Sequence, residues 1–226
     1  MILKGTLVNI LAVIAGCVVG RTLGHLIPER MRRTVMMGLG LAVLLIGFQL
    51  ALQSRNPLIV IGALLIGGII GEVLSIEAHL EKIGHRLQDR FKDAGNVAEA
   101  FVTASLLYCI GAMAIMGSIQ DGLGLEPTIL YAKSALDGIA SVALTSTLGI
   151  GVIFSVVPLL IYQGAITLMA VSVQGFLTDP VVAEMNATGG LLIVAIGLDI
   201  LQIKKLPIGN LLPAIFVAAG IAIVLG

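Results

Sequence analysis

Long runs of hydrophobic residues, separated by short polar breaks, fill almost the whole chain. Several runs approach or exceed the roughly 20 residues that an α-helix needs to cross the hydrocarbon core of a bilayer. The pattern predicts an all-α, polytopic membrane protein that forms a single integral-membrane domain over residues 1–226, with about eight transmembrane helices. The expected spans are residues 2–24, 35–53, 57–75, 98–119, 127–148, 151–174, 184–203 and 207–225.

The composition supports this class. Of the 226 residues, 58% are hydrophobic and 12% are charged, against about 25% charged in soluble domains. A soluble core could not bury this much apolar surface, so the lipid bilayer is the expected partner. Neither a basic groove nor interleaved aromatic residues suggest a nucleic acid. The first apolar run lacks a basic leading region and a cleavage site, which indicates a retained helix.

Positive charges orient the predicted spans. With the N-terminus outside, ten lysines and arginines fall in inside loops, and only Lys4 and Arg55 remain outside. This asymmetry satisfies the positive-inside rule and places both termini outside. The inside residues are Arg21, Arg30, Arg32, Arg33, Lys82, Arg86, Arg90, Lys92, Lys204 and Lys205.

The longest connection, residues 76–95, has the pattern of an amphipathic helix. Its apolar residues recur every three or four positions, which places them on one helical face, and mixed charges occupy the opposite face. We expect an interfacial helix on the cytoplasmic membrane surface. The alternative is a dimer contact or a docking helix for another protein.

Two segments of the chain match at an offset of 150 residues. Gly40, Leu41, Ile46, Gly47 and Pro57 recur as Gly190, Leu191, Ile196, Gly197 and Pro207. The two segments run in opposite directions across the membrane in the predicted topology, so the match indicates an inverted-topology repeat with broken helices, a common plan of secondary transporters. A chance likeness between glycine-rich apolar helices is the alternative.

Glycines at four-residue spacing form two ladders, one at residues 16, 20 and 24 and one at residues 67 and 71. Small residues at this spacing allow close helix packing in lipid. A homo-oligomer through these glycine-rich faces is one expectation.

The fifth span carries polar residues at every fourth position: Lys133, Asp137, Ser141 and Thr145. These side chains share one helical face. Because a charge at membrane depth costs at least about 2.5 kcal/mol, the face must contact protein or water. It is either a structural ion pair of Lys133 with Asp137 or part of a binding site, and the ion pair leaves Ser141 and Thr145 unexplained.

Further polar residues lie near or within neighbouring spans. In the segment 117–127, either Asp121 and Gly122 form an outer turn, or the helix ends at Gly117. In the second case Ser118, Gln120 and Asp121 fold back beside the polar face of the fifth span, which is allowed where irregular backbone lines a protein cavity. The candidate substrate- or ion-binding residues are Gln120, Asp121, Lys133, Asp137, Ser141, Gln163 and Asp199, with Asn9 and Asn186 as weaker members.

The oxygen atoms of these candidates suit hard cations, so a bound Na⁺ or H⁺ is the expected coupling ion. Asp199 has the alternative role of pairing with the nearby Lys204 and Lys205. Neither a Cys/His metal motif nor a resident cofactor is expected. No HExxH or GxSxG motif is present, so an enzyme is not expected.

The stretches GSIQDGL, KSALDG, YQGAIT and GGLLIVAIGLDILQIKKLPIGNLLPA resemble an uncharacterised bacterial inner-membrane family, that of the YdfK/YqgA type. The resemblance extends over essentially the full chain. It implies a multi-pass protein of the bacterial cytoplasmic membrane and a transporter, without a known substrate or established functional residues.

We therefore expect a secondary transporter of an ion or small polar solute, with cation coupling. The first alternative is an ion channel with the same polar lining, which would not accumulate its solute against a gradient. The second is a non-transporting scaffold or sensor that works through the helix at residues 76–95.

Overall fold

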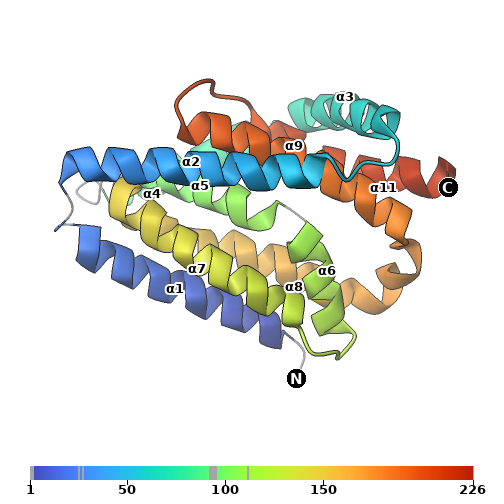
Figure 1. Ribbon diagram of the computed structural model, residues 1–226, viewed down its shortest axis with the longest axis horizontal. Helices are drawn as coiled ribbons and strands as arrows, with labels where there is room; N and C mark the ends of the chain where they lie inside the picture. The colour runs from blue at the N-terminus through green and yellow to red at the C-terminus, as the bar shows by residue number, and fades with distance from the viewer. Residues whose placement is uncertain (1–2, 25, 27, 92–95, 111, 226) are drawn as a thin grey trace. The chain divides into compact units, whose positions relative to one another are not determined.

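The computed structural model describes residues 3–24, 26, 28–91, 96–110 and 112–225, and the regular elements in these residues are helices (Figure 1). The all-α fold predicted from the sequence is confirmed. In chain order the elements are α1 (Lys4–Gly24), α2 (Glu29–Ala51), α3 (Pro57–Leu74), α4 (Ile76–Arg90), α5 (Val97–Cys109), α6 (Ala112–Gly122), α7 (Thr128–Leu148), η1 (Ile150–Ser155), α8 (Val156–Val173), η2 (Gln174–Phe176), α9 (Asp179–Ile200), α10 (Ile208–Leu211) and α11 (Pro213–Leu225).

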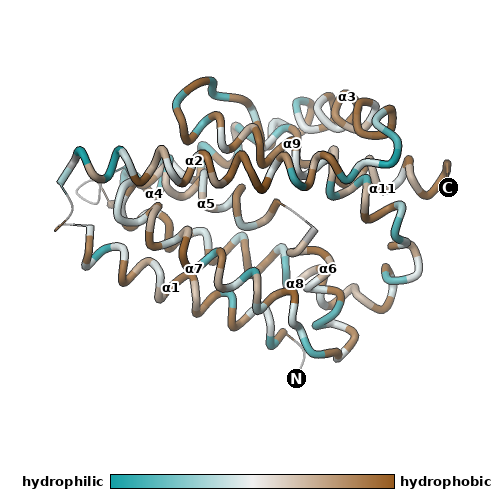
Figure 2. The backbone as a smooth tube through the Cα atoms, in the orientation of Figure 1, coloured by the Kyte–Doolittle hydropathy of each residue, from teal (hydrophilic) through white to brown (hydrophobic). Residues whose placement is uncertain are grey.

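Within these residues, six helical segments are long and apolar enough to cross a membrane, and α5 with α6 makes a seventh if the bent pair is one span. In Figure 2, brown, hydrophobic tube recurs along these segments and alternates with white and teal. The polytopic class is confirmed. The six are Lys4–Gly24, Arg30–Ala51, Pro57–Leu74, Ile150–Phe176, Asp179–Ile200 and Ile208–Leu225.

Helix α7 occupies the fifth predicted span and is not in this set, although its 21 residues are enough to cross a bilayer. Its lysine, its aspartate and its run of serines and threonines lower its apolar character. The predicted count of eight spans needs α7 as a span and stays a prediction.

The predicted span at residues 98–119 is broken rather than continuous. Its two parts, Val97–Cys109 and Met113–Gly122, are bent by 62° relative to each other. The sequence has Gly111 at the break, a residue type that weakens helices by about 1 kcal/mol relative to alanine, and this residue lies outside the described ones. Both alternatives for residues 117–127 are wrong, because α6 continues through Asp121 to Gly122 and the turn follows at residues 123–125.

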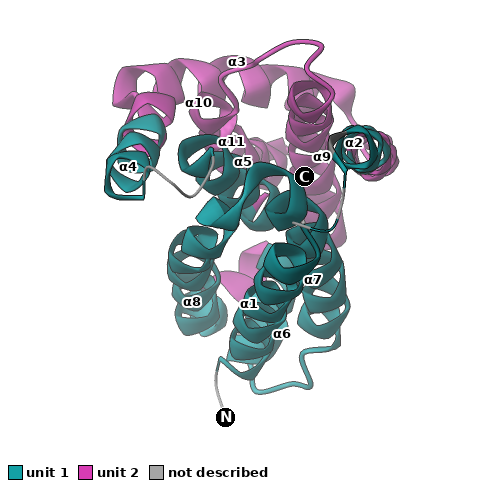
Figure 3. Cartoon of the chain, turned by 90° about the vertical axis from the view of Figure 1, so that its left-hand side faces the viewer, with its two compact units in different colours: residues 1–39, 81–109, 113–172 teal, residues 40–80, 110–112, 173–226 magenta. Residues whose placement is uncertain are grey.

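The chain forms two compact units (Figure 3). Unit 1 comprises residues 1–39, 81–109 and 113–172, and unit 2 comprises residues 40–80, 110–112 and 173–226. Each unit therefore combines segments from both halves of the chain.

In unit 1, the glycine ladder of α1 packs directly on α7. A Cβ atom added at Gly16 would lie 2.3 Å from the carbonyl oxygen of Gly138, so only glycine permits this approach. The contacts advance in the same direction along both helices, from Gly5 at Leu130 to Gly20 at Thr145. Helices α1 and α7 are therefore parallel neighbours.

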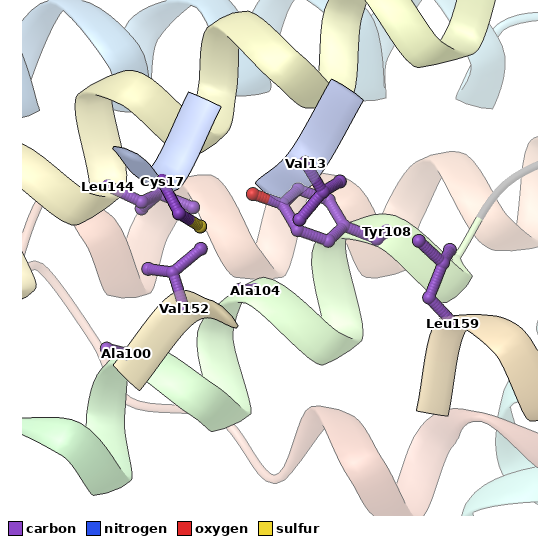
Figure 4. Packing of buried hydrophobic residues seen from close by; sticks show 8 residues of the cluster. All are labelled: Val13, Cys17, Ala100, Ala104, Tyr108, Leu144, Val152 and Leu159. Carbon is purple, nitrogen blue, oxygen red and sulfur yellow. The ribbon is translucent and has the colours of Figure 1, made fainter. Parts of the chain in front are cut away.

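Apolar packing around this pair forms the core of unit 1 (Figure 4). Helix α5 approaches η1 closely, where Gly151 lies against Val97 and Ala100, and Tyr108 is the largest buried side chain of the group. The core residues are Val13, Cys17, Ala100, Ala104, Tyr108, Leu144, Val152 and Leu159.

In unit 2, the second glycine ladder is covered by α10 and α11. Gly67 lies against Ala214 and Gly71 against Asn210, so α3 runs antiparallel to this pair. Both ladders are thus used inside the chain. A homo-oligomer through glycine-rich faces stays a prediction, and these two ladders are already occupied.

Helix α4 confirms the helix predicted from residue 76 and extends to Arg90; residues 92–95 of that prediction lie outside the described ones. Gly84 packs against Ala98, whereas the apolar Ile83 is 45% exposed. The position of α4 at the membrane surface stays a prediction.

Candidate intramembrane polar site

The polar face predicted on α7 is buried in unit 1. Lys133 is 5% exposed and Asp137 is 7% exposed, and Ser141 and Thr145 are also buried. The four-residue spacing aligns these side chains on one helical face. This face is directed at α1, because Gly16 lies against Ser141 and Gly20 against Thr145. The backbone of α1, which presents only hydrogen atoms at its glycines, leaves room for the polar side chains.

Lys133 and Asp137 form the predicted ion pair. The Lys133 ammonium donates to Oδ2 of Asp137, and the amide of Asn9 on α1 donates to the same oxygen at 2.9 Å. Both charges belong to α7, so the ion pair joins no two helices. The connection between α1 and α7 at this point is the amide hydrogen bond of Asn9.

Ser141 extends the cluster by one helical turn. Its hydroxyl donates to the carbonyl oxygen of Asp137 at 2.7 Å, and its oxygen lies 2.7 Å from the Tyr108 hydroxyl. Because the serine proton is used, Tyr108 is the donor in the second bond. The Lys133 ammonium lies 5.9 Å from the centroid of the Tyr108 ring, a distance at which cation–π attraction acts.

Gln120 and Asp121 accept hydrogen bonds from backbone N–H groups at the N-termini of two helices. Asp121 Oδ2 accepts from the backbone N–H of Gly5 at 2.9 Å and of Thr6 at 3.4 Å. Gln120 Oε1 accepts from the N–H of Ile129 at 3.3 Å. The first N–H groups of a helix have no partner inside it, so Asp121 caps α1 and Gln120 caps α7.

The same end of unit 1 carries an exposed ion pair between Lys4 and Glu126, with a nitrogen-to-oxygen distance of 3.1 Å. The hydrogen bond from Lys4 lowers the pKa of Glu126 below its usual value. The α6–α7 connection therefore contacts the N-terminal end of α1 through this exposed ion pair as well as through the cap that Asp121 makes.

Gln163 lies on α8 with no exposed surface. Neither its Nε2 nor its Oε1 atom has a hydrogen-bond partner among the residues that the structure describes. Leu159 and Thr167, one turn before and after it, share its helical face. Leu159 belongs to the core cluster that includes Tyr108, and the carbonyl of Thr167 packs against Gly122. Gln163 thus lies on the face of α8 that packs inside unit 1.

The remaining two candidates belong to unit 2. Asn186 on α9 donates to Oε1 of Gln53 at 2.8 Å, and Asp199 is half-buried in the last turn of α9. Of the nine candidates, the structure brings together Asn9, Lys133, Asp137 and Ser141 by direct contacts, and it places Gln120, Asp121 and Gln163 elsewhere in the same unit.

Two features of the structure, the place of Tyr108 beside the polar face and the capping role of Glu184, were not predicted from the sequence. Tyr108 is one of three tyrosines in the chain. Its polar hydroxyl within a largely apolar segment is the sequence feature that could have indicated it. Buried Glu184 on α9 accepts from the backbone N–H groups of Arg55 and Asn56, at 2.7 and 2.9 Å, and from the Ser54 hydroxyl at 2.8 Å. It holds the connection between α2 and α3.

Apolar helices of spanning length that enclose buried charges define a polytopic α-helical membrane protein. The chain belongs to the family described as "Protein of unknown function (DUF554)", which matches residues 4–223. It is 32% identical over 217 residues to the "Uncharacterized membrane protein YdfK" of Bacillus subtilis (strain 168), covering 94% of this chain and 93% of the relative. It is 33% identical over 220 residues to the "Uncharacterized protein YqgA" of Escherichia coli (strain K12), covering 95% and 94%. No solved structure matches the chain.

Proposed function

We propose that this protein is a cation-coupled secondary transporter of an ion or small polar solute, and not an enzyme. The polar face of α7, with Asn9 and Tyr108 beside it, is the solute site of this proposal. The observation that carries it is the buried pair of Lys133 and Asp137 in a membrane protein.

The ion pair is a costly way to build a purely structural contact. Removing two charges from water costs several kcal/mol per ion, and apolar residues of similar size in place of a buried pair often stabilise a protein. The close packing of α1 on α7 already rests on Gly16 and Gly20. An ion pair within one helix adds no tertiary link to that packing, so a functional role explains the charges better.

The chemistry of the cluster suits a solute that competes with the ion pair. The Lys133 ammonium can hold an anionic group, and the Asp137 carboxylate can hold a cation or a proton. The hydroxyls of Ser141 and Tyr108 can donate to or accept from a polar solute. Entry of a charged solute would separate the pair, which makes occupancy and conformation interdependent.

Contacts in unit 2 support the inverted repeat on which many secondary transporters are built. Gly47 lies against Gly190, and Gly197 lies 3.2 Å, measured from an added Cβ atom, from the carbonyl oxygen of Gly40. In the 150-residue match, Gly40 corresponds to Gly190 and Gly47 to Gly197. The matched glycines therefore meet crosswise between antiparallel helices, as a two-fold pseudo-symmetry requires.

The test begins with a thermal-shift screen of purified protein against inorganic ions, carboxylates and amino acids. A ligand that binds only the folded state raises stability by RT ln(1 + [L]/Kd), which is about 2.7 kcal/mol at a hundredfold excess over Kd. Labelled hits are then followed as uptake into proteoliposomes. We expect accumulation of at least one solute against its gradient, driven by a cation gradient.

The Asp137→Asn variant keeps the shape of the side chain but leaves the buried Lys133 ammonium unbalanced, so it should be less stable than wild type. The fraction that folds should lose uptake. The matched control is the double variant Lys4→Met, Glu126→Gln, which removes the exposed pair and should transport normally. Flux without accumulation would indicate a channel instead. Full uptake by Asp137→Asn would contradict the proposed site.

A further inference from the structure

A second group of buried polar side chains lies in unit 1, near the cap that Asp121 makes on α1. Thr6, Ser118, Gln163 and Thr167 are each at most 2% exposed. In the described part of the chain, their hydroxyl oxygens and both amide atoms of Gln163 have no hydrogen-bond partner. Burying a polar group without a partner costs stability, and a native protein that keeps several of them together requires an explanation.

Backbone contacts bring these side chains to one place. The N–H of Thr6 on α1 lies 3.4 Å from Oδ2 of Asp121 on α6. Two residues on, Gly122 packs against the carbonyl of Thr167 on α8. Ser118 precedes Asp121 by three residues and Gly122 by four, so its side chain projects between the directions of α1 and α8.

Gln163 completes the group, because it precedes Thr167 by one turn and shares its helical face. Gly164, the next residue along α8, lies 3.7 Å from a methyl carbon of Leu3, just before α1, measured from an added Cβ atom. The N-terminal end of α1, the C-terminal end of α6 and the middle of α8 therefore meet, and these side chains belong to the segments that meet.

The charge of Asp121 indicates what these oxygens can bind. Asp121 is 2% exposed, and no salt bridge to it occurs within residues 3–24, 26, 28–91, 96–110 and 112–225. The N-terminus of α1 contributes a partial positive charge of about +0.5. Negative charge remains, in contrast to Asp137, which Lys133 balances.

We propose that Asp121, Thr6, Ser118, Gln163 and Thr167 form a binding site for a monovalent hard cation, Na⁺. Carboxylate, hydroxyl and amide oxygens are the ligands that hard cations prefer. One carboxylate neutralises one positive charge, whereas a divalent ion would leave an excess positive charge in a buried site. The role of this Na⁺ as the coupling ion rests on the transport function proposed above; its binding does not.

The test measures the thermal stability of purified protein in NaCl, KCl and choline chloride at equal ionic strength. Wild-type protein should unfold several degrees higher in NaCl than in choline chloride, as a saturating ligand of the folded state requires. Asp121→Asn keeps a side chain that can cap α1 and should lose this shift. Ser118→Ala leaves the cap untouched and should weaken the apparent Na⁺ affinity about tenfold, the effect of losing about 1.4 kcal/mol of binding free energy.

Ser105→Ala is the matched control, since Ser105 on α5 is also buried and its hydroxyl also has no partner among the described residues. It should keep the full Na⁺ shift. Equal stabilisation by all three salts would overturn the proposal, and so would equal losses in Ser105→Ala and Ser118→Ala. Stabilisation by Na⁺ without any solute uptake would support this cation site and contradict the proposed transport function. Solute uptake that does not depend on Na⁺, in a protein that Na⁺ does not stabilise, would support transport and contradict this cation site.

Discussion

Asp121 and Asp137 are both buried carboxylates of unit 1, and their partners differ. The Asp137 carboxylate accepts hydrogen bonds from the Lys133 ammonium and the Asn9 amide. The Asp121 carboxylate accepts from two backbone N–H groups at the start of α1. The same residue type therefore takes part in a balanced ion pair at one position and in a helix cap with residual negative charge at the other. This difference separates the proposed solute site from the proposed cation site.

Glu184 gives a prediction at the residue scale. Glu184→Ala should leave the N–H groups of Arg55 and Asn56 without their acceptor and lower the free energy of unfolding by about 1–3 kcal/mol. The measurement is the midpoint of thermal unfolding in detergent. Glu126→Ala removes an exposed glutamate, whose solvated ion pair with Lys4 contributes little, and should change that midpoint much less. Equal midpoints for Glu184→Ala and wild type would show that the buried cap contributes nothing.

Sequence spacing predicts contacts between residues on one helix better than contacts between helices. The pair of Lys133 with Asp137 follows from a four-residue spacing on α7. The partners of Glu184 lie 128 to 130 residues away, and Tyr108 is 33 residues from Ser141. No local pattern indicates such partners, because tertiary packing brings them together.

At the scale of elements, two features of unit 1 depend on glycine and on helix ends. The glycine ladder of α1 was visible in the sequence, and its function in close packing is confirmed by the contacts with α7. The bend between α5 and α6 was not predicted, because the apolar run continues through it without a proline. The hydrophobicity of a segment indicates whether it lies in lipid or in water, whereas a bend depends on local backbone geometry.

Gly16 gives the prediction at this scale. Gly16→Ala should force α1 away from α7, because the added Cβ atom would lie 2.3 Å from the Gly138 carbonyl oxygen. We expect a loss of about 1–3 kcal/mol, as for other overpacked cores. Gly220→Ala on α11 is the control, since no described atom outside the helix's own neighbouring backbone lies within 4 Å of its added Cβ. It should be neutral or slightly stabilising. A neutral Gly16→Ala would contradict the close packing of α1 on α7.

At the scale of the whole molecule, the parallel packing of α1 and α7 constrains the topology. Parallel spans must be separated by an odd number of crossings. If α1, α2, α3 and α7 all cross the membrane, α2 and α3 supply two crossings, and the prediction of eight spans then needs the bent pair of α5 and α6 as a third crossing. The parallel packing of α1 and α7 agrees with the eight spans predicted from the apolar runs, and that count stays a prediction.

The topology makes a prediction of its own. A reporter that is active only in the cytoplasm should be inactive when fused after Gly226 and active when inserted between α4 and α5. The lysine and arginine distribution favours an arrangement with both termini outside and α4 inside. Cytoplasmic activity of the C-terminal fusion would reverse the orientation and the directions assigned to the inverted repeat.

The measurement that most directly tests the central claim is solute uptake by the double variant Lys133→Met, Asp137→Leu. Either single change strands a buried charge and should cost about 3–5 kcal/mol, whereas the double change removes both charges and should restore stability. If the polar face of α7 binds the transported solute, proteoliposomes with the stable double variant will show no uptake above protein-free vesicles. Uptake at the wild-type rate would show that the pair is structural and would contradict the proposed solute site.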